Sequence, residues 1–243
     1  AAVAGTQLPD GYLIKASNTD YANIIDPVDG TDPANVTAFT AGLANKKITP
    51  GSASSTTSFT SMVAGTMYFY KIFSYTNSGT IIDFKTDNTP LLKHATKPNP
   101  ATAGLFTPTS ASTANITWTA PTGFDASRHN ILVFVKAGAA VTAGTPTSLT
   151  SAYIANTGFM SGTGYQNDAN AYCVYNGDGT SVAITGLPDG TTFFTLIYCV
   201  MEESNSNGTA SYSSSITPSG TTSCLAKTIP YFEGFETNHT NGS

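Results

Sequence analysis

Two segments of this chain recur later in the sequence, and both copies carry residues typical of β-strands. Residues 11–16 (Gly-Tyr-Leu-Ile-Lys-Ala) resemble residues 131–137 (Ile-Leu-Val-Phe-Val-Lys-Ala). Residues 58–72 resemble residues 181–197 in the order of their apolar, glycine and aromatic positions. The members of each pair are separated by similar stretches of chain, about the length of one β-sandwich domain. The repeat therefore predicts two copies of one β unit.

Within the copies, apolar and polar residues alternate as they do in half-buried strands. Ile116 and Trp118 share one face, while the neighbouring threonines take the other. Pro-Asp-Gly triplets at 9–11 and 188–190 separate the strands, and long stretches of helix-forming residues are missing. The strand after Gly190 places four residues on one face: Phe193, Thr195, Ile197 and Cys199. The sequence predicts an all-β protein.

A proline-rich connector at 97–100 separates the two copies, and proline favours an extended, semi-rigid link. The predicted domains are therefore 1–97 and 98–222, followed at 223–243 by a linker and the start of a further domain. Alignment of the copies sets Ala1 near Ala120, so the first domain is expected to lack its first two strands. Such a sandwich exposes edges and apolar surface unless an unshown segment or another chain covers them.

Composition narrows the class of partner. Charged residues make up 10% of the chain, against roughly 25% in typical soluble domains, so serine, threonine, asparagine and glycine must supply the polar surface. Such a surface suits an extracellular β-protein. The net charge is −5 and Arg128 is the only arginine, which leaves no basic stripe for nucleic acid or for an anionic membrane. Because no run of about 18 apolar residues is present, we also expect no membrane insertion.

The second copy carries the residues of a known family. A tryptophan (Trp118) in its second strand is followed by Leu-x-x-Gly-Thr-x-Phe at 187–193, and this pattern resembles the fibronectin type III superfamily. The resemblance implies two immunoglobulin-like β-sandwiches in tandem and no activity of their own. In that family the aromatic is usually a tyrosine whose hydroxyl bonds back to the backbone. Tyr68 matches it in the first copy, whereas Phe193 departs from it and cannot form that bond.

Other segments resemble a narrower group. Residues 9–31 and 175–180 resemble fibronectin-type repeats of secreted Bacteroidota proteins, in which such repeats accompany hydrolases and adhesins. Residues 229–236 resemble the opening of a jelly-roll domain related to cleaved-adhesin and choice-of-anchor modules. The resemblance implies a piece of a larger extracellular or cell-surface protein. Its partners would be neighbouring domains of that protein and a cell-surface glycan or protein.

Four aspartates occur in one loop-rich segment, and calcium prefers such carboxylates together with backbone carbonyls. They are Asp20, Asp26, Asp29 and Asp32. Their spacing does not match an EF-hand loop, and Asp-Pro and Asp-Gly pairs are ordinary turn chemistry. Turns are the favoured interpretation, with calcium the one cofactor left open.

The three cysteines fit no metal-ligand spacing. A disulfide between Cys173 and Cys199 would suit an extracellular protein, provided that the fold brings their Cα atoms within bonding range. Buried apolar thiols are the favoured alternative. Cys224 falls in the exit linker, where it could pair outside this chain.

Aromatic residues offer one candidate ligand surface. Tyr153, Phe159 and Tyr165 occur in the middle of the second copy, near Tyr172 and Tyr175, and exposed aromatic faces can stack on sugars. Most strand aromatics pack in the core instead. The long, Gly/Thr-rich segment 137–170 is the best candidate contact surface, because binding residues concentrate in long loops.

No catalytic residues are predicted. His94, His129 and His239 fall in different predicted elements, and no serine occupies a Gly-x-Ser-x-Gly nucleophile elbow. We therefore expect a non-catalytic extracellular spacer or display module. The alternatives are an adhesion or carbohydrate-binding module and the accessory region of a secreted hydrolase.

Overall fold

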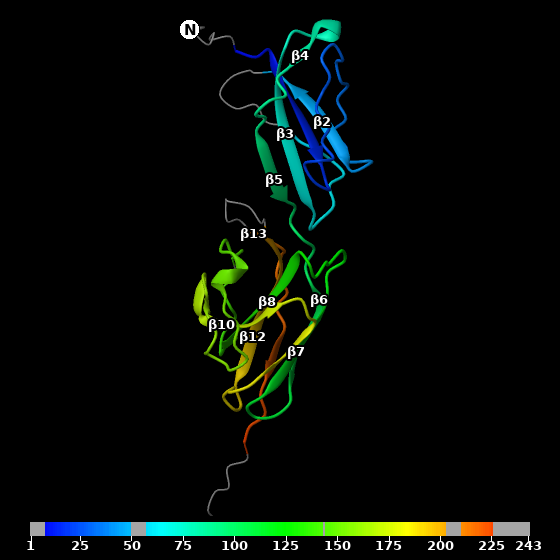
Figure 1. Ribbon diagram of the computed structural model, residues 1–243. Coiled ribbons are helices and arrows are strands. Elements are labelled where there is room, and N and C mark those ends of the chain that lie inside the picture. The colour runs from blue at the N-terminus through cyan, green and yellow to red at the C-terminus, as the bar shows by residue number, and fades with distance from the viewer. Residues whose placement is uncertain (1–7, 50–56, 143, 203–209, 226–243) are drawn as a thin grey trace, which may run out of the picture.

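The computed structural model describes residues 8–49, 57–142, 144–202 and 210–225, and this part of the chain is all-β (Figure 1). Its strands form one sheet in the first unit and two sheets in the second. The two units lie end to end, with the connector between β5 and β6 at their junction. The described residues contain two 3-10 turns and no helix with the length and apolarity to cross a membrane.

The first unit is a five-stranded antiparallel sheet in the order β2-β1-β3-β4, with β5 also paired to β3. Its long strands are rich in aromatic and β-branched residues, which fit a pleated sheet. A 3-10 turn, η1 (Gly79–Ile81), precedes the shortest strand. The strands are β1 (Gly11–Ser17), β2 (Leu43–Ile48), β3 (Met67–Thr76), β4 (Asp83–Phe84) and β5 (Leu91–Ala95).

The two faces of this sheet are covered unequally. On the outer face, Leu13 and Phe73 are fully buried beneath Ile24, Ile82 and Phe84. The opposite, inner face is buried at one end, where Tyr68 packs with Ala16, Phe39 and Ala44. Farther along the inner face, Ile14, Tyr70 and Ile72 are only half-buried.

The second unit is a sandwich of two sheets. The larger sheet has the order β13-β12-β8-β10-β9 with β14 also paired to β12, and the smaller has the order β11-β7-β6. The smaller sheet contains β6 (Thr102–Pro108), β7 (Ala114–Thr119) and β11 (Ser181–Ile184). The larger sheet contains β8 (His129–Ala137), β9 (Gly164–Tyr165), β10 (Asp168–Gly177), β12 (Thr192–Glu202), β13 (Ala210–Tyr212) and β14 (Ser219–Thr221).

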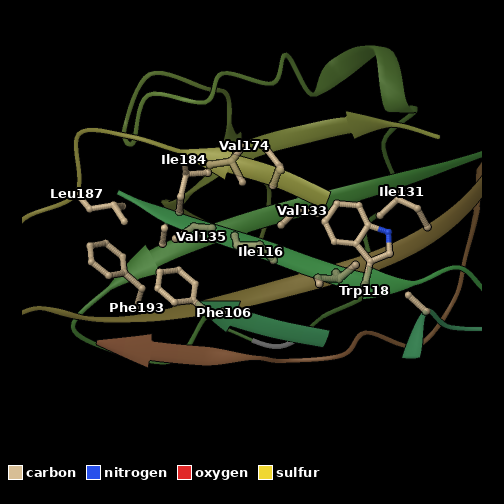
Figure 2. Close-up of a cluster of buried hydrophobic side chains, with 14 of the residues drawn as sticks. Phe106, Ile116, Trp118, Ile131, Val133, Val135, Val174, Ile184, Leu187 and Phe193 are labelled. Atoms are coloured by element: carbon tan, nitrogen blue, oxygen red, sulfur yellow. The ribbon is translucent and has the colours of Figure 1, made fainter. Parts of the chain in front are cut away.

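The principal core lies between these two sheets (Figure 2). Phe106, Ile116 and Trp118 project from the smaller sheet against Val133 and Phe193 of the larger one. The indole Nε1–H of Trp118 donates to the carbonyl oxygen of Gly179 at 3.1 Å, so the polar atom of this ring is satisfied. The alternation read from the sequence at Ile116 and Trp118 is the inward face of β7.

A second core covers the outer face of the larger sheet. Leu132, Phe134, Leu196 and Tyr198 of β8 and β12 pack there beneath residues of the connection between β8 and β10, which includes η2 (Thr150–Ala152). Because both faces of β8 and β12 are buried, these strands are nearly continuous apolar runs. In both units, therefore, part of the long connection after the first central strand folds over the outer face.

The predicted fold class is confirmed: the described residues are all-β, with an immunoglobulin-like two-sheet sandwich in the second unit and one sheet of such a sandwich in the first. The strand order of the second unit, with β8 and β12 central and β6, β7 and β11 facing them, defines that class. Within the described residues the first unit has the counterparts of β8 and β12 but none of β6 and β7.

Candidate functional site

The junction between the units is held by direct contacts. His129 of β8 is 2% exposed, and its Nε2–H donates to the carbonyl oxygen of Gly65 at 3.1 Å. The hydroxyl of Ser211 donates to the carbonyl oxygen of Ala95 at 3.1 Å. Met67 and Ala95 of the first unit pack against Met201 of the second. These contacts link three strands of the larger sheet, β8, β12 and β13, to the first unit.

Beside this junction is a cavity of about 440 Å³ whose walls come from both units. Thr19, Phe69 and Lys93 contribute from the first unit, and Arg128 and Glu202 from the second. The Glu202 carboxylate accepts hydrogen bonds from the backbone N–H and the hydroxyl of Thr150. Glu202 therefore fixes η2 of its own unit, which gives this carboxylate a structural role.

A larger groove of about 610 Å³ lies on the inner face of the first unit. Ile14, Tyr70, Ile72 and Leu92 form its floor, and Phe59 lies at its side. Burial raises the pKa of the Tyr70 phenol to about 12, so this hydroxyl is neutral at physiological pH. The groove is therefore both larger and more apolar than the cavity beside the junction.

The aspartates considered as calcium ligands are not brought together. Asp26 forms an ion pair with Lys71 at 3.2 Å, and Asp32 pairs with Lys47. The Lys47 hydrogen bond holds the pKa of the Asp32 carboxyl below its usual value. Asp29 accepts a hydrogen bond from the backbone N–H of Phe84 at 2.8 Å. Asp20 accepts two hydrogen bonds at 2.8 Å from Asn23, as in an ordinary turn.

Because each of these carboxylates has its own partner, the calcium hypothesis is not supported. Among the residues that the structure describes, no group of three or more His, Cys, Asp or Glu side chains could hold a metal ion.

The disulfide left open between Cys173 and Cys199 is not formed. Cys199 packs in the core between the sheets, whereas Cys173 packs in the second core on the other side of the same sheet. Strand β8 also lies between their strands, so the two thiols face opposite ways across a backbone layer. Both are buried free thiols, and burial raises the pKa of each to about 12. Cys224 is free and exposed.

Two of the three aromatics considered as ligand contacts are buried. Tyr153 is 3% and Tyr165 is 1% exposed, and both rings pack on Phe134. Phe159 is partly buried and packs edge-on against Phe193 at a centroid distance of 5.2 Å. These rings therefore build the protein core and are not free to stack on a sugar.

The segment 137–170 is a structured cover over that second core. The side-chain oxygen of Gln166 accepts hydrogen bonds from the backbone N–H groups of Thr147 and Ser148 and from the Tyr153 hydroxyl, at 3.1, 3.2 and 3.0 Å. Asn176 donates to the carbonyl oxygens of Thr150 and Tyr153, both at 3.0 Å. Hydrogen bonds within the segment and from Asn176 of β10 hold it in place, so its described residues do not form an open binding loop.

One buried ion pair in this cover has no signature in the sequence. Lys136 donates to Asp168 at 2.7 Å, and the Asp168 side chain is 5% exposed. Burial by itself would raise the pKa of Asp168, but hydrogen bonds from Lys136 and from the Thr142 backbone outweigh it and lower that pKa to about 2. The two residues are 32 positions apart, and only the pairing of β10 with β8 brings them together.

The corner positions of the two units, Tyr68 and Phe193, differ in whether they form a hydrogen bond, as the sequence predicts. The backbone N–H of Val63 donates to the Tyr68 hydroxyl at 2.7 Å, which ties the start of β3 to the preceding turn. Phe193 occupies the equivalent place in β12, where it stacks on Phe106 at 5.8 Å. In the second unit, aromatic packing replaces the hydrogen bond.

The histidines are separated by the fold. His129 is committed to the junction, and His94 is an exposed residue of β5 opposite Tyr68. His239 and the segment 229–236 lie outside the described residues.

Comparisons with known proteins identify no family. No protein-family model matches the sequence, and no curated protein matches it. Among solved structures, a two-domain fibronectin type III segment from chicken tenascin is similar at 15% identity and a TM-score of 0.38, covering 90% of this chain and 87% of that one. The sixth fibronectin type III domain from human fibronectin type III domain containing protein 3 is 15% identical, with a TM-score of 0.33, covering 55% of this chain and 93% of that one. The FN5 domain of Drosophila Lar is 13% identical, with a TM-score of 0.27, covering 51% and 97%.

Proposed function

We propose that this chain is a non-catalytic spacer and display module of a larger secreted or surface-anchored protein from a Bacteroidota bacterium. The observation that carries the proposal is the fixed junction between the two units. His129 and Ser211 each bond to a backbone carbonyl across it, and Met201 packs on Met67 and Ala95. A module that sets distance and orientation needs such a junction, because interdomain motion is otherwise the default.

The connector supports the same role. Pro98 in it is buried, and the backbone N–H of Gly65 donates to the carbonyl oxygen of Lys97 at 3.2 Å. Proline restricts the link to extended conformations. The connector is therefore fastened to the first unit and does not behave as a free tether.

Small-angle X-ray scattering of the 243-residue chain tests this proposal. We expect the wild-type curve to fit one elongated, end-to-end arrangement. A His129→Ala/Ser211→Ala double variant should broaden the distance distribution, because both polar contacts across the junction are lost. Thr107→Ala, at an exposed position of β6 away from the junction, is the control and should leave the curve unchanged. If the wild-type distance distribution is as broad as that of the double variant, a spacer of fixed geometry is refuted.

The proposed location is tested separately. Protease added to intact cells that produce the full-length protein should release fragments of this region, because a display module is exposed outside the cell. Protection in intact cells, with cleavage only after lysis, would rule out the extracellular assignment.

The two alternative functions, a carbohydrate-binding module and an accessory region of a hydrolase, make different demands on these residues. A carbohydrate-binding module would lack its main candidate sugar contacts, because Tyr153 and Tyr165 are in the core. An accessory region of a secreted hydrolase requires the same spacing role, and the identity of the neighbouring domains would decide between it and an adhesin.

A further inference from the structure

The cavity beside the junction has the size and position of a small-molecule site. Its volume is about 440 Å³, and its walls come from both units. Small-molecule sites typically measure about 300–1,000 Å³ and often lie between domains. Strands β3 and β5 of the first unit meet β8 and β12 of the second here, so residues that are far apart in the sequence face one space.

Three planar polar side chains of the second unit line this cavity: Arg128, Asn130 and Glu202. The Arg128 side chain is 55% exposed, and its guanidinium makes no hydrogen bond to a described residue. Oε1 of Glu202 accepts both hydrogen bonds from Thr150, whereas its Oε2 has no partner in the described part of the chain. Asn130 uses its amide nitrogen, which donates to Asn176 at 3.4 Å, and leaves its amide oxygen to accept. Within these contacts, each group therefore keeps a hydrogen-bonding atom for a ligand.

The apolar part of the wall suits the C–H face of a sugar ring. Phe69 of β3 is half-buried and lines the cavity, and Tyr21 packs against it at a centroid distance of 5.0 Å and an interplanar angle of 77°. Aromatic rings attract C–H groups because their faces carry partial negative charge. The other large apolar residues of the wall are Met67, Val200 and Met201. A sugar has both an apolar C–H face and a rim of hydroxyls, so it matches an aromatic ring beside planar polar groups.

The charges around the cavity nearly balance. Lys93 and Arg128 contribute two cations to the wall, and Glu202 contributes a carboxylate. A second carboxylate, that of Asp125, lies 3.6 Å from Nε of Arg128. An anionic ligand would meet both carboxylates and a cationic ligand would meet both cations, and like charges across an interface oppose association. An uncharged polar ligand avoids both repulsions.

We propose that this cavity binds one uncharged sugar unit of a glycan. The C–H face of the sugar lies on Phe69. Arg128 donates to its hydroxyl oxygens, and its hydroxyls donate to Asn130 and Glu202. The inference depends on the same fixed junction as the spacer function. The failures of the two can be distinguished, because scattering reports the junction in the absence of any sugar.

NMR titration of the 243-residue chain with the methyl glycosides of glucose, galactose, mannose and N-acetylglucosamine tests the proposal. We expect at least one of these sugars to bind saturably at millimolar concentration and to shift backbone amides of cavity residues in both units. Methyl glucuronide differs from methyl glucoside only by its carboxylate, and it should bind no more tightly than the glucoside does.

Two exposed cations supply the first pair of matched variants. Arg128→Leu should weaken binding about tenfold, as expected for the loss of one hydrogen bond to a charged group. Lys85→Leu removes a cation of similar exposure, 58%, beside β4 at the end of the first unit away from the junction (Figure 1). It should leave the affinity unchanged.

Two half-buried rings supply the second pair. Phe69→Leu keeps an apolar side chain but removes the ring, and it should weaken binding about fivefold. Phe59→Leu makes the same change on the opposite face of the sheet, where Phe59 packs with Tyr68, and should have no effect. Scattering of each variant without sugar checks that the junction is intact.

Any one of four results would overturn the proposal. The first is the absence of saturable binding by all the neutral glycosides, and the second is a set of shifts confined to one unit. The third is an equal effect of the two members of either variant pair. The fourth is tighter binding of the glucuronide than of the glucoside, which would make an anion the ligand.

Discussion

The Nε2–H of His129 donates to the carbonyl oxygen of Gly65 across the boundary between the two units, at 3.1 Å. Because a carbonyl oxygen can only accept, Nε2 carries the proton of the imidazole. Nδ1 is then free to accept the backbone N–H of Asp125, which lies 3.0 Å away. One ring thus connects the turn before β8 to the turn before β3, and its bond to the first unit depends on the close approach of Gly65.

Gly65 should not tolerate a side chain. It has a φ of +63°, and a Cβ there would lie 2.7 Å from Nε2 of His129. We expect Gly65→Ala to lower the free energy of unfolding through backbone strain of about 1–2 kcal/mol and through loss of a hydrogen bond worth about 1 kcal/mol. Urea unfolding measures the sum.

Gly79→Ala is the matched control for that experiment. Gly79 has a φ of +62°, and a Cβ added there would have no neighbouring atom within 4 Å among the described residues, so its substitution reports backbone strain alone. If the two variants lose equal stability, the junction contact of His129 contributes nothing.

Strands with one buried and one exposed face, such as β7, were predictable together with their inward residues, because apolar and polar residues alternate along them. The alternation around Trp118 and the corner tyrosine Tyr68 are local patterns, and each is read from a few neighbouring residues. The arrangement of Cys173 and Cys199 was not predictable in the same way. Their strands are buried on both faces, so apolar character no longer reports which face a residue takes. A register shift between Cys173 and Tyr175 removes the remaining guide.

The cover over the second core could not be predicted from the sequence either. Its segment is rich in glycine and threonine, and its tyrosines follow no strand or helix period. Their burial depends on distant partners: the Tyr212 hydroxyl donates to the carbonyl oxygen of Ser148 at 2.5 Å, 64 positions away. Such partners satisfy the polar ends of buried tyrosines, and they exist only once β10 and β12 flank β8.

The tyrosine corner of the first unit should contribute measurably to the free energy of unfolding. Tyr68→Phe removes the acceptor of the Val63 N–H, and we expect a loss of about 1 kcal/mol in the free energy of unfolding. Tyr70→Phe is the control, because the described residues provide no hydrogen-bond partner for that hydroxyl. It should change stability by less than about 0.5 kcal/mol. Equal losses for the two variants would contradict a stabilising corner.

The reverse substitution in the second unit should not restore such a corner. Phe193 is 0% exposed and lies between Phe106 and Phe159, at 5.8 and 5.2 Å. A hydroxyl added by Phe193→Tyr enters this apolar contact, and burying it without a partner costs about 1–3 kcal/mol. A gain in unfolding free energy by urea titration would show that a backbone donor reaches this position.

The three thiols should react very differently in the native protein. Burial raises the pKa of Cys173 and Cys199 to about 12, so both stay protonated and inaccessible at pH 8, whereas Cys224 is exposed. Iodoacetamide should therefore add one label to the folded chain and three after denaturation, as read by intact mass. Cys224→Ser should abolish the native label, and a native label that persists in this variant would contradict the burial of the other two.

Acid should weaken the second unit through Asp168. Its pKa is lowered from 3.8 to about 2 in the folded chain, against the opposing effect of burial, by Lys136 and the Thr142 N–H. A depressed folded pKa stabilises the protein above the unfolded pKa, and this contribution is lost as the pH falls from about 4 through about 2.

Asp168→Asn leaves Lys136 without its partner, and we expect a loss of about 3 kcal/mol at pH 7, near the lower end for breaking a buried pair. Urea midpoints measured from pH 7 to pH 2 should fall less steeply below pH 4 for this variant than for wild type, while Asp178→Asn, at an exposed turn, should follow the wild-type curve. If Asp168→Asn and wild type lose stability in parallel below pH 4, other carboxylates carry the acid sensitivity, and the Lys136–Asp168 pair does not anchor the cover.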